Sequence, residues 1–200
     1  MHVLTVIDHP NPQSLTHAIA VRFGDGAAEA GHTVEMADLH AEGFRPAWCM
    51  ADVEADGGAD LPADVRAEQV RIERCDALCL VFPLFWWGMP SMLKGWVDRV
   101  WSYGWAYDDV DDPSKSLQPA RTCVMLVPSG ASPQSMAPHG YPGALKTIWR
   151  TGTLGYFGMT DTRIHLLHGS QGSDERRARL LETAYQAGLT VGDPAHRQTS

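Results

Sequence analysis

Five short apolar runs, each followed by a stretch with helical spacing, constrain the fold of this chain more than any other feature. The runs lie at residues 2–8, 32–37, 77–82, 122–127 and 162–167. The helical patterns follow them at 15–30, 61–72, 90–100, 145–154 and from 173 onward. Such alternation is typical of βαβ units, which build a parallel sheet covered by helices on both faces. With right-handed crossovers it predicts an α/β fold, a doubly wound five-stranded parallel sheet in a three-layer α/β/α arrangement. We expect one domain over residues 1–195.

The charge balance excludes two classes of partner. The chain has 16 Lys and Arg against 24 Asp and Glu, a net charge of −8. Nucleic acids and anionic membrane surfaces bind clustered basic side chains, so we expect neither as a partner. No apolar stretch approaches the roughly 20 residues that cross a bilayer. The first residues have no basic segment, and Asp8 interrupts the apolar run too early for a signal peptide. These features favour a cytoplasmic protein.

The cysteines and histidines give no sign of a metal site. Cys49, Cys75, Cys79 and Cys123 form no Cys-x-x-Cys pair, and three of the four lie in apolar runs. We interpret them as reduced thiols of the core, which fits a cytoplasmic protein. No His-x-x-x-His pair or His/Cys cluster has ligand spacing, so we expect no metal. We also expect the connection 39–61, with its apolar Trp48-Cys49-Met50, to be packed.

Ligands of doubly wound sheets bind at the carboxyl ends of the strands, which selects the loops 8–16, 83–90 and 128–141. The first loop places Ser14 and Thr16 at the start of a helix, where free N–H groups can hold a phosphate. The alternative is that Ser14 only caps the helix. Neither Gly-x-Gly-x-x-Gly nor Gly-Lys-Ser/Thr occurs in this loop, which disfavours a dinucleotide site of the Rossmann type and a P-loop.

The second and third loops favour a flat ligand. Phe85, Trp86 and Trp87 are consecutive aromatic residues in a loop, and a loop cannot bury all of them in the core. A planar ring is their natural occupant, and a hydrophobic plug or a dimer contact is the alternative. Gly130 in the third loop allows close backbone approach to a ligand. His139 follows it, as either a catalytic or a surface histidine. A flavin contains both a planar ring and a phosphate.

The residues needed for acyl transfer or for a phosphorelay receiver are missing from the sequence. No Gly-x-Ser-x-Gly elbow is present for acyl transfer. A phosphorelay receiver would need an acidic cluster after the first strand and a Lys after the fifth. Here Asp8 has no acidic neighbour, and His168-Gly169-Ser170 follow the fifth strand.

The sequence resembles the flavodoxin-fold NAD(P)H:quinone oxidoreductases. Five stretches carry the resemblance and occur in the same order over most of residues 1–160: His9-Pro10-Asn11-Pro12-Gln13-Ser14, residues 38–44 (DLHAEGF), residues 82–107 (FPLFWWGMPSMLKGWVDRVWSYGWAY), His139-Gly140-Tyr141 and residues 151–159 (TGTLGYFGM). The resemblance implies a flavodoxin-like fold and a bound flavin, FAD or FMN.

The resemblance also implies roles for particular residues. In the family, one segment binds the phosphate and ribityl (or pyrophosphate) part of the flavin. In this sequence it matches His9, Ser14, Leu15, Thr16 and His17. The segment that lines the isoalloxazine matches Pro83, Leu84, Phe85, Trp86 and Trp87. A third loop that contacts the flavin matches Pro128, Ser129, Gly130 and Ala131. Here Val127 and Pro128 replace the two threonines usual in the family, so side-chain hydroxyl contacts are lost there and backbone contacts are expected to carry the role.

The remaining implied roles concern catalysis and assembly. His139 matches a histidine that assists charge transfer, although the tyrosine that accompanies it in the family is absent near Met136. Trp105 and Tyr107 match a segment that closes the substrate pocket of the partner protomer, which implies a homodimer, and Tyr141 is expected in the same pocket. Packing beneath the 103–119 loop is the alternative for the two aromatic residues.

The implied activity is a ping-pong transfer of two electrons from NAD(P)H, through the flavin, to a quinone or similar acceptor. Two other functions stay open at this point. One is a flavin-binding regulatory or accessory subunit of a membrane transport system with little turnover of its own. The other is a fold that has lost its cofactor.

Overall fold

The computed structural model describes residues 1–55, 61–108, 116–119, 121–193 and 195. A single sheet of five parallel strands forms its centre, in the order β2-β1-β3-β4-β5. The strands are β1 (His2–Ile7), β2 (Thr33–Asp38), β3 (Ala77–Val81), β4 (Arg121–Ser129) and β5 (Met159–His168). Each predicted strand is present within a few residues of its expected bounds, and the doubly wound order is confirmed. The residues 109–115 of the 103–119 loop lie outside the described part of the chain.

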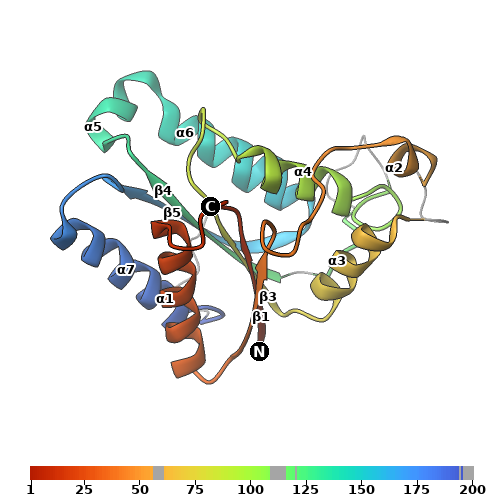
Figure 1. The fold of residues 1–200 in the computed structure, drawn as a ribbon, viewed down its shortest axis with the longest axis horizontal. Helices are drawn as coiled ribbons and strands as arrows, with labels where there is room; N and C mark the ends of the chain where they lie inside the picture. The colour runs from red at the N-terminus through yellow and green to blue at the C-terminus, as the bar shows by residue number, and fades with distance from the viewer. Residues whose placement is uncertain (56–60, 109–115, 120, 194, 196–200) are drawn as a thin grey trace.

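Helices cover both faces of the sheet (Figure 1). The elements are α1 (Leu15–Glu29), α2 (Met50–Glu54), α3 (Ala63–Glu73), α4 (Ser91–Val100), α5 (Pro133–Met136), a 3₁₀ turn η1 (Ala137–His139), α6 (Tyr141–Lys146), a π-helical segment η2 (Thr147–Gly155) and α7 (Asp174–Leu189). Helices α1 and α7 lie together on one face, and α3, α4 and α6 lie on the other (Figure 1). The three-layer arrangement is therefore confirmed.

The two faces bury separate apolar cores. Under α1 and α7 the core contains Phe23, Ala27 and Ala184, none of which is exposed. The helices cross closely here, since a Cβ added at Gly26 would lie 2.1 Å from the carbonyl oxygen of Tyr185. Under α3, α4 and η2 the core is larger and more aromatic, and Trp96 is its largest fully buried side chain. Covering both faces explains why the central strands are almost wholly apolar.

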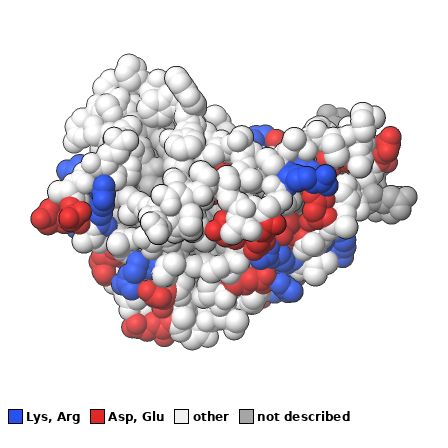
Figure 2. Space-filling view, viewed as in Figure 1, with Lys and Arg blue, Asp and Glu red and all other residues white. Residues whose placement is uncertain are grey.

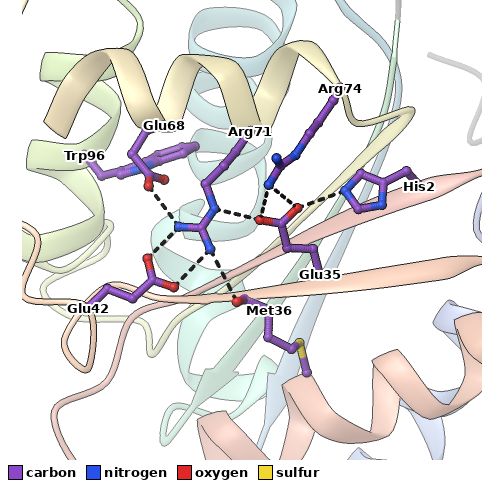
Figure 3. Close-up of polar contacts among 8 residues, drawn as sticks. All are labelled: His2, Glu35, Met36, Glu42, Glu68, Arg71, Arg74 and Trp96. Atoms are coloured by element: carbon purple, nitrogen blue, oxygen red, sulfur yellow. Dashed lines mark hydrogen bonds and ion pairs between the residues drawn. The ribbon is translucent and has the colours of Figure 1, made fainter. Parts of the chain in front are cut away.

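An ion-pair network joins the edge strand β2 to α3 (Figure 3). Arg71 of α3 donates to Glu35 of β2 at 2.9 Å and to Glu68 at 2.9 Å, and it also bonds Glu42 in the loop after β2. Arg74 donates to the same Glu35 at 2.7 Å. Burial alone would raise the pKa of Glu35, but hydrogen bonds from Arg71, Arg74 and His2 lower that pKa to about 2. The network therefore holds the loop after β2 against the body of the protein.

Part of the connection 39–61 differs from expectation. Trp48 and Met50 are 65% and 67% exposed, and Cys49 is exposed as well, so the apolar tripeptide is not packed into the core of this chain. It lies at the start of the short helix α2, which the sequence pattern did not predict. The other three cysteines are buried free thiols, and burial raises the pKa of Cys75 to about 11. In the described part of the chain, no helix combines the length and the apolar character needed to cross a membrane.

Candidate functional site

The loops after β1, β3 and β4 meet at one edge of the sheet. Ile7 pairs with Val81, and the Asp8 backbone N–H donates to the Val81 carbonyl at 3.0 Å. The Asp8 side chain is only 2% exposed, and it accepts a hydrogen bond from the backbone N–H of Leu93 at 2.8 Å. Its other oxygen lies 2.9 Å from Nε2 of His40. Asp8 therefore joins the ends of β1 and β2 to the start of α4.

Polar side chains surround the first turn of α1. Ser14 is the N-cap residue, and its hydroxyl oxygen accepts the backbone N–H of His17 at 3.2 Å. The same oxygen lies 2.9 Å from Nδ1 of His17, and Nε2 of that ring lies 2.8 Å from Oδ2 of Asp38. The ring of His9 meets the ring of His17 edge to face at 6.3 Å. The remaining N–H groups of a first helical turn have no acceptor within the helix and are suited to bind an anion.

The other two residues predicted at this turn, Leu15 and Thr16, are less accessible to a ligand than Ser14. Thr16 is 2% exposed, and Leu15 packs against the core beneath α1.

Burial alone would raise the pKa of Asp38, but hydrogen bonds from His17 and from the backbone N–H groups of Ala41 and His40 lower that pKa below its ordinary value. Asp38 is therefore ionised near neutral pH. Its ionised carboxylate only accepts hydrogen bonds, which fixes how His17 is oriented.

The aromatic residues after β3 form a tight hairpin. Phe85 and Gly88 exchange both backbone hydrogen bonds, at 3.3 and 2.9 Å, around Trp86 and Trp87. Both tryptophans have positive φ, 46° and 62°, as a two-residue turn with two left-handed central positions requires. Bulky side chains rarely adopt this conformation, and backbone strain of this kind is concentrated at functional sites. Trp86 is 97% exposed, so the turn projects its ring into the surroundings.

A cleft of about 430 Å³ lies between this hairpin and the loop after β4. Its lining consists of Pro83, Leu84, Phe85, Trp86, Trp87, Pro128, Ser129, Gly130, Ala131, Ser170 and Gln171. The two loops are joined directly, because the Leu84 backbone N–H donates to the Pro128 carbonyl at 3.0 Å. The cleft thus contains all nine residues predicted in these two loops.

The end of β5 supports the loop after β4. The Ser129 carbonyl accepts the backbone N–H groups of Gly169 and Ser170, at 2.8 and 3.1 Å. His168 Nδ1 lies 2.9 Å from the carbonyl oxygen of Ala131. Ser170 and Gln171 were not predicted as lining residues. The rule that places ligands at strand ends would have found them if it had been applied to the fifth strand as well as to the first, third and fourth.

Tyr141 and His139 lie beside the aromatic hairpin. The ring of Trp87 stacks on the ring of Tyr141, with centroids 3.8 Å apart and planes inclined by 22°. The ring of His139 lies 5.4 Å from that of Tyr141. His139 is exposed at the end of η1 and does not line the cleft itself. The stack therefore connects His139 to the hairpin through Tyr141.

Trp105 and Tyr107 lie elsewhere in this chain. Tyr107 lines a second cavity of about 460 Å³, together with Trp48, Trp101 and Tyr156. The indole N–H of Trp105 donates to Glu73 at 2.9 Å, and its ring lies 5.7 Å from that of Phe157. Neither residue belongs to the cleft between the hairpin and the loop after β4. The structure of this chain thus separates these two residues from the predicted site residues of the cleft.

Comparison with known proteins gives the family of the chain. Residues 1–189 match the family described as having the flavodoxin-like fold. An NAD(P)H:quinone oxidoreductase from Methanothermobacter marburgensis has a similar solved structure, with a TM-score of 0.86 and 31% identity, over 94% of this chain and 98% of that one.

Two further relatives extend this result. A protein of Haemophilus influenzae named as an NAD(P)H oxidoreductase is 28% identical over 193 residues, which cover 93% of each chain. The general stress protein 14 of Treponema denticola, solved in complex with FMN, has a TM-score of 0.65 and 26% identity, over 94% of this chain and 98% of that one. The chain therefore belongs to the family of flavodoxin-like fold proteins that includes these NAD(P)H oxidoreductases and quinone reductases.

Proposed function

We propose that this protein is a flavin-dependent oxidoreductase that passes two electrons from NAD(P)H to a quinone or a similar acceptor. The observation that carries the proposal is the pairing, at one sheet edge, of an uncharged aromatic cleft with a helix start rich in hydrogen-bond donors. Relatives named as NAD(P)H oxidoreductases and quinone reductases support the reaction class. A structural relative solved with FMN supports the cofactor.

The residues of the two regions fit the two ends of a flavin. The cleft has a volume of about 430 Å³, within the range of small-molecule sites. Its two main segments carry no charge, because residues 77–93 and 122–145 contain no Asp, Glu, Lys or Arg. Figure 2 shows that the surface over α5 is nearly free of charged side chains, whereas such side chains gather over α1, α7 and α3. An uncharged ring would bind in the cleft and an anionic phosphate at the first turn of α1.

In this proposal each group of residues has a distinct role. The isoalloxazine would be held by residues 83–87 and by Pro128, Ser129, Gly130 and Ala131. The phosphate of FMN, or the pyrophosphate of FAD, would be held by His9, Ser14, Leu15, Thr16 and His17. The bound flavin supplies the acceptance and release of a hydride equivalent, which no side chain can supply.

The remaining residues would serve the substrates. Backbone N–H groups of the loop 128–131 would stabilise negative charge where it develops on the ring. His139 would donate a hydrogen bond or a proton to the bound acceptor, and Tyr141 would stack beside it. NAD(P)H and the acceptor would use the same cleft in turn, which is a ping-pong mechanism. Trp86, whose side chain is almost fully exposed, would cover whichever substrate is bound.

Assembly, domain organisation and location complete the proposal. We propose one domain over residues 1–195 in a homodimer, in which Trp105 and Tyr107 of one protomer close the cleft of the other. The second cavity exposes apolar side chains beside these residues, among them Trp48 at 65% exposure. Such an apolar face is typical of an interaction surface. The free thiols of the four cysteines favour the cytoplasm.

Turnover with a quinone tests the proposed function. The purified protein should be yellow, or should become yellow with added FMN or FAD, and NADPH or NADH should bleach it. Addition of menadione should restore the colour and sustain oxidation of the nucleotide. A yellow protein that neither nucleotide bleaches would support the binding or accessory role instead. A colourless protein with no affinity for either flavin would contradict the proposal.

A further inference from the structure

Ser14, His17 and Asp38 form a linear chain of hydrogen bonds at the start of α1. Nδ1 of His17 lies 2.9 Å from the Ser14 hydroxyl oxygen, and Nε2 lies 2.8 Å from Oδ2 of Asp38. The side chain of His17 is 13% exposed and that of Asp38 is 23% exposed. Both ring nitrogens are therefore committed to named partners in a site that is largely shielded from water.

The carboxylate determines which ring nitrogen carries the proton. Oδ1 of Asp38 already accepts the backbone N–H groups of His40 and Ala41, each at 3.1 Å, which leaves Oδ2 for His17. An ionised carboxylate can only accept hydrogen bonds, so Nε2 of His17 must carry a proton. In the neutral ring, Nδ1 is then unprotonated and can only accept a hydrogen bond.

The state of His17 in turn determines what the Ser14 hydroxyl can bind. When His17 is neutral, Nδ1 accepts the hydroxyl proton of Ser14, and that proton is not available to a ligand. When His17 is protonated, Nδ1 donates to the Ser14 oxygen, which also accepts the backbone N–H of His17 at 3.2 Å. Both lone pairs of the oxygen are then used, and the hydroxyl proton is free to point outward. Only this second state presents a donor to a phosphate oxygen.

We propose that His17 and Asp38 form a proton-linked positioning pair, in which binding of the flavin phosphate at Ser14 is coupled to protonation of His17. The inference rests on the proposed function, because it assumes that the first turn of α1 receives the phosphate. A protonated His17 also adds a positive charge beside the anion, which stabilises the complex further. Since linkage is reciprocal, proton uptake strengthens flavin binding as much as flavin binding strengthens proton uptake.

Two other histidines of the described residues lie near the His17–Asp38 pair, and they differ in role. From the loop after β1, the His9 ring faces His17 at 6.3 Å. From the loop after β2, His40 donates its backbone N–H to Asp38, and its ring lies 2.9 Å from the buried carboxylate of Asp8. His40 is therefore a matched control: it is a second histidine paired with a carboxylate at the same edge, and its ring makes no contact with Ser14 among the described residues.

Proton uptake on flavin binding tests the inference. The probes are FMN, FAD and riboflavin, which lacks the phosphate. Isothermal titration calorimetry in buffers of different ionisation enthalpy gives the protons bound per flavin between pH 6 and 8. The variants are His17→Gln, which cannot take up a proton, and the control His40→Gln. Because the phosphate of FMN itself titrates near pH 6, the difference between wild type and H17Q is the quantity to compare.

The wild type should take up more protons than H17Q on binding FMN or FAD, by up to about one proton per site. The Kd of the wild type should accordingly weaken with rising pH, by up to about tenfold per pH unit more steeply than that of H17Q. H40Q should behave as the wild type, and riboflavin should show no difference between wild type and H17Q. In the FMN complex, ¹⁵N shifts of His17 should show both ring nitrogens protonated.

Two results overturn the inference in distinguishable ways. If FMN or FAD binds and wild type and H17Q take up equal numbers of protons, the coupling is wrong while the proposed function stands. If neither flavin binds to any variant, the proposed function fails and the inference fails with it.

Discussion

The two halves of the candidate site are built in different ways. At the first turn of α1, the side chains of Ser14, His17 and Asp38 satisfy one another through hydrogen bonds, and the backbone follows ordinary helix capping. At the aromatic hairpin, Trp86 and Trp87 adopt left-handed backbone conformations, and Trp86 is almost fully exposed. One half is stabilised by its own polar contacts, whereas the other keeps strain and exposed apolar surface.

The difference shows which half depends on a ligand. The polar half is arranged before any anion binds, which lowers the cost of ordering it on binding. The hairpin instead exposes aromatic surface that water solvates poorly, so a planar ligand would cover it with a gain in free energy. Asp8 lies outside both halves but at the same edge of the sheet, where it joins the end of β1 to His40 and to the start of α4.

Removal of the Asp8 carboxylate should have the largest effect. In Asp8→Ala, the buried N–H of Leu93 and the ring of His40 lose their acceptor, which should lower the free energy of unfolding by about 2–4 kcal/mol. Chemical denaturation with urea measures the change. Asp25→Ala is the control, since Asp25 pairs with Arg22 at the surface and should change stability by less than about 0.5 kcal/mol. Equal losses in both variants would show that the Asp8 carboxylate does not stabilise this edge of the sheet.

Truncation of Trp87 should weaken the aromatic half alone. Trp87→Ala removes the ring that stacks on Tyr141, a contact of about 0.5–1.5 kcal/mol beyond the area buried. Flavin affinity should fall about tenfold or more, as measured by quenching of flavin fluorescence. Tyr185→Ala on α7 serves as the control, because it removes an aromatic ring that packs against Arg22 instead of the cleft. If flavin content stays unchanged in Trp87→Ala, Trp87 does not belong to the site.

Acid should destabilise the protein in part through Glu35, which lies outside both halves. The pKa of Glu35 is lowered to about 2 in the folded state from an ordinary value of 4.5. Because the folded pKa is the lower one, its contribution is complete above pH 4.5 and is lost as the pH falls from 4.5 to about 2. Glu35→Gln should therefore reduce the loss of stability over this range, by about 1–2 kcal/mol after allowance for solvent screening. Urea denaturation at pH 6 and pH 3 compares the variant with wild type. An identical pH dependence would contradict the importance of the Arg71 network in Figure 3.

Relief of strain in the hairpin should have the smallest effect, with the opposite sign. Asn tolerates positive φ better than Trp does, so Trp86→Asn should raise the free energy of unfolding by about 0.5–1 kcal/mol. Trp48→Asn is the matched control, because Trp48 is also exposed but does not have positive φ. The midpoint of urea denaturation should rise for the first variant and not for the second. A fall in the midpoint for Trp86→Asn would show that the turn is not strained.

The sequence predicts most of the fold because its signals are local. The runs at 77–82 and 122–127 are almost wholly apolar, and covering of both faces of the sheet favours that pattern in its central strands. The short helix α2 and the tripeptide Trp48-Cys49-Met50 were not predicted correctly. Their apolar residues are exposed in this chain, and local composition cannot distinguish a buried apolar residue from an exposed one.

Prediction of the site from sequence is more uneven. Residues 83–87 and the loop 128–131 could be placed together because parallel strands end at one edge. The pairing of His17 with Asp38 could not be predicted from spacing, since the two residues lie 21 positions apart on different elements. The positive φ of Trp86 and Trp87 also escaped prediction, because turns of this type usually contain Asn or Gly.

A crystal structure of the protein with FMN bound tests the proposed site most directly. The isoalloxazine should lie in the cleft between Trp87 and Gly130, with the phosphate at the first turn of α1 against Ser14. Electron density for the flavin in the second cavity, beside Trp101 and Tyr107, with no flavin in the cleft, would contradict the proposed site.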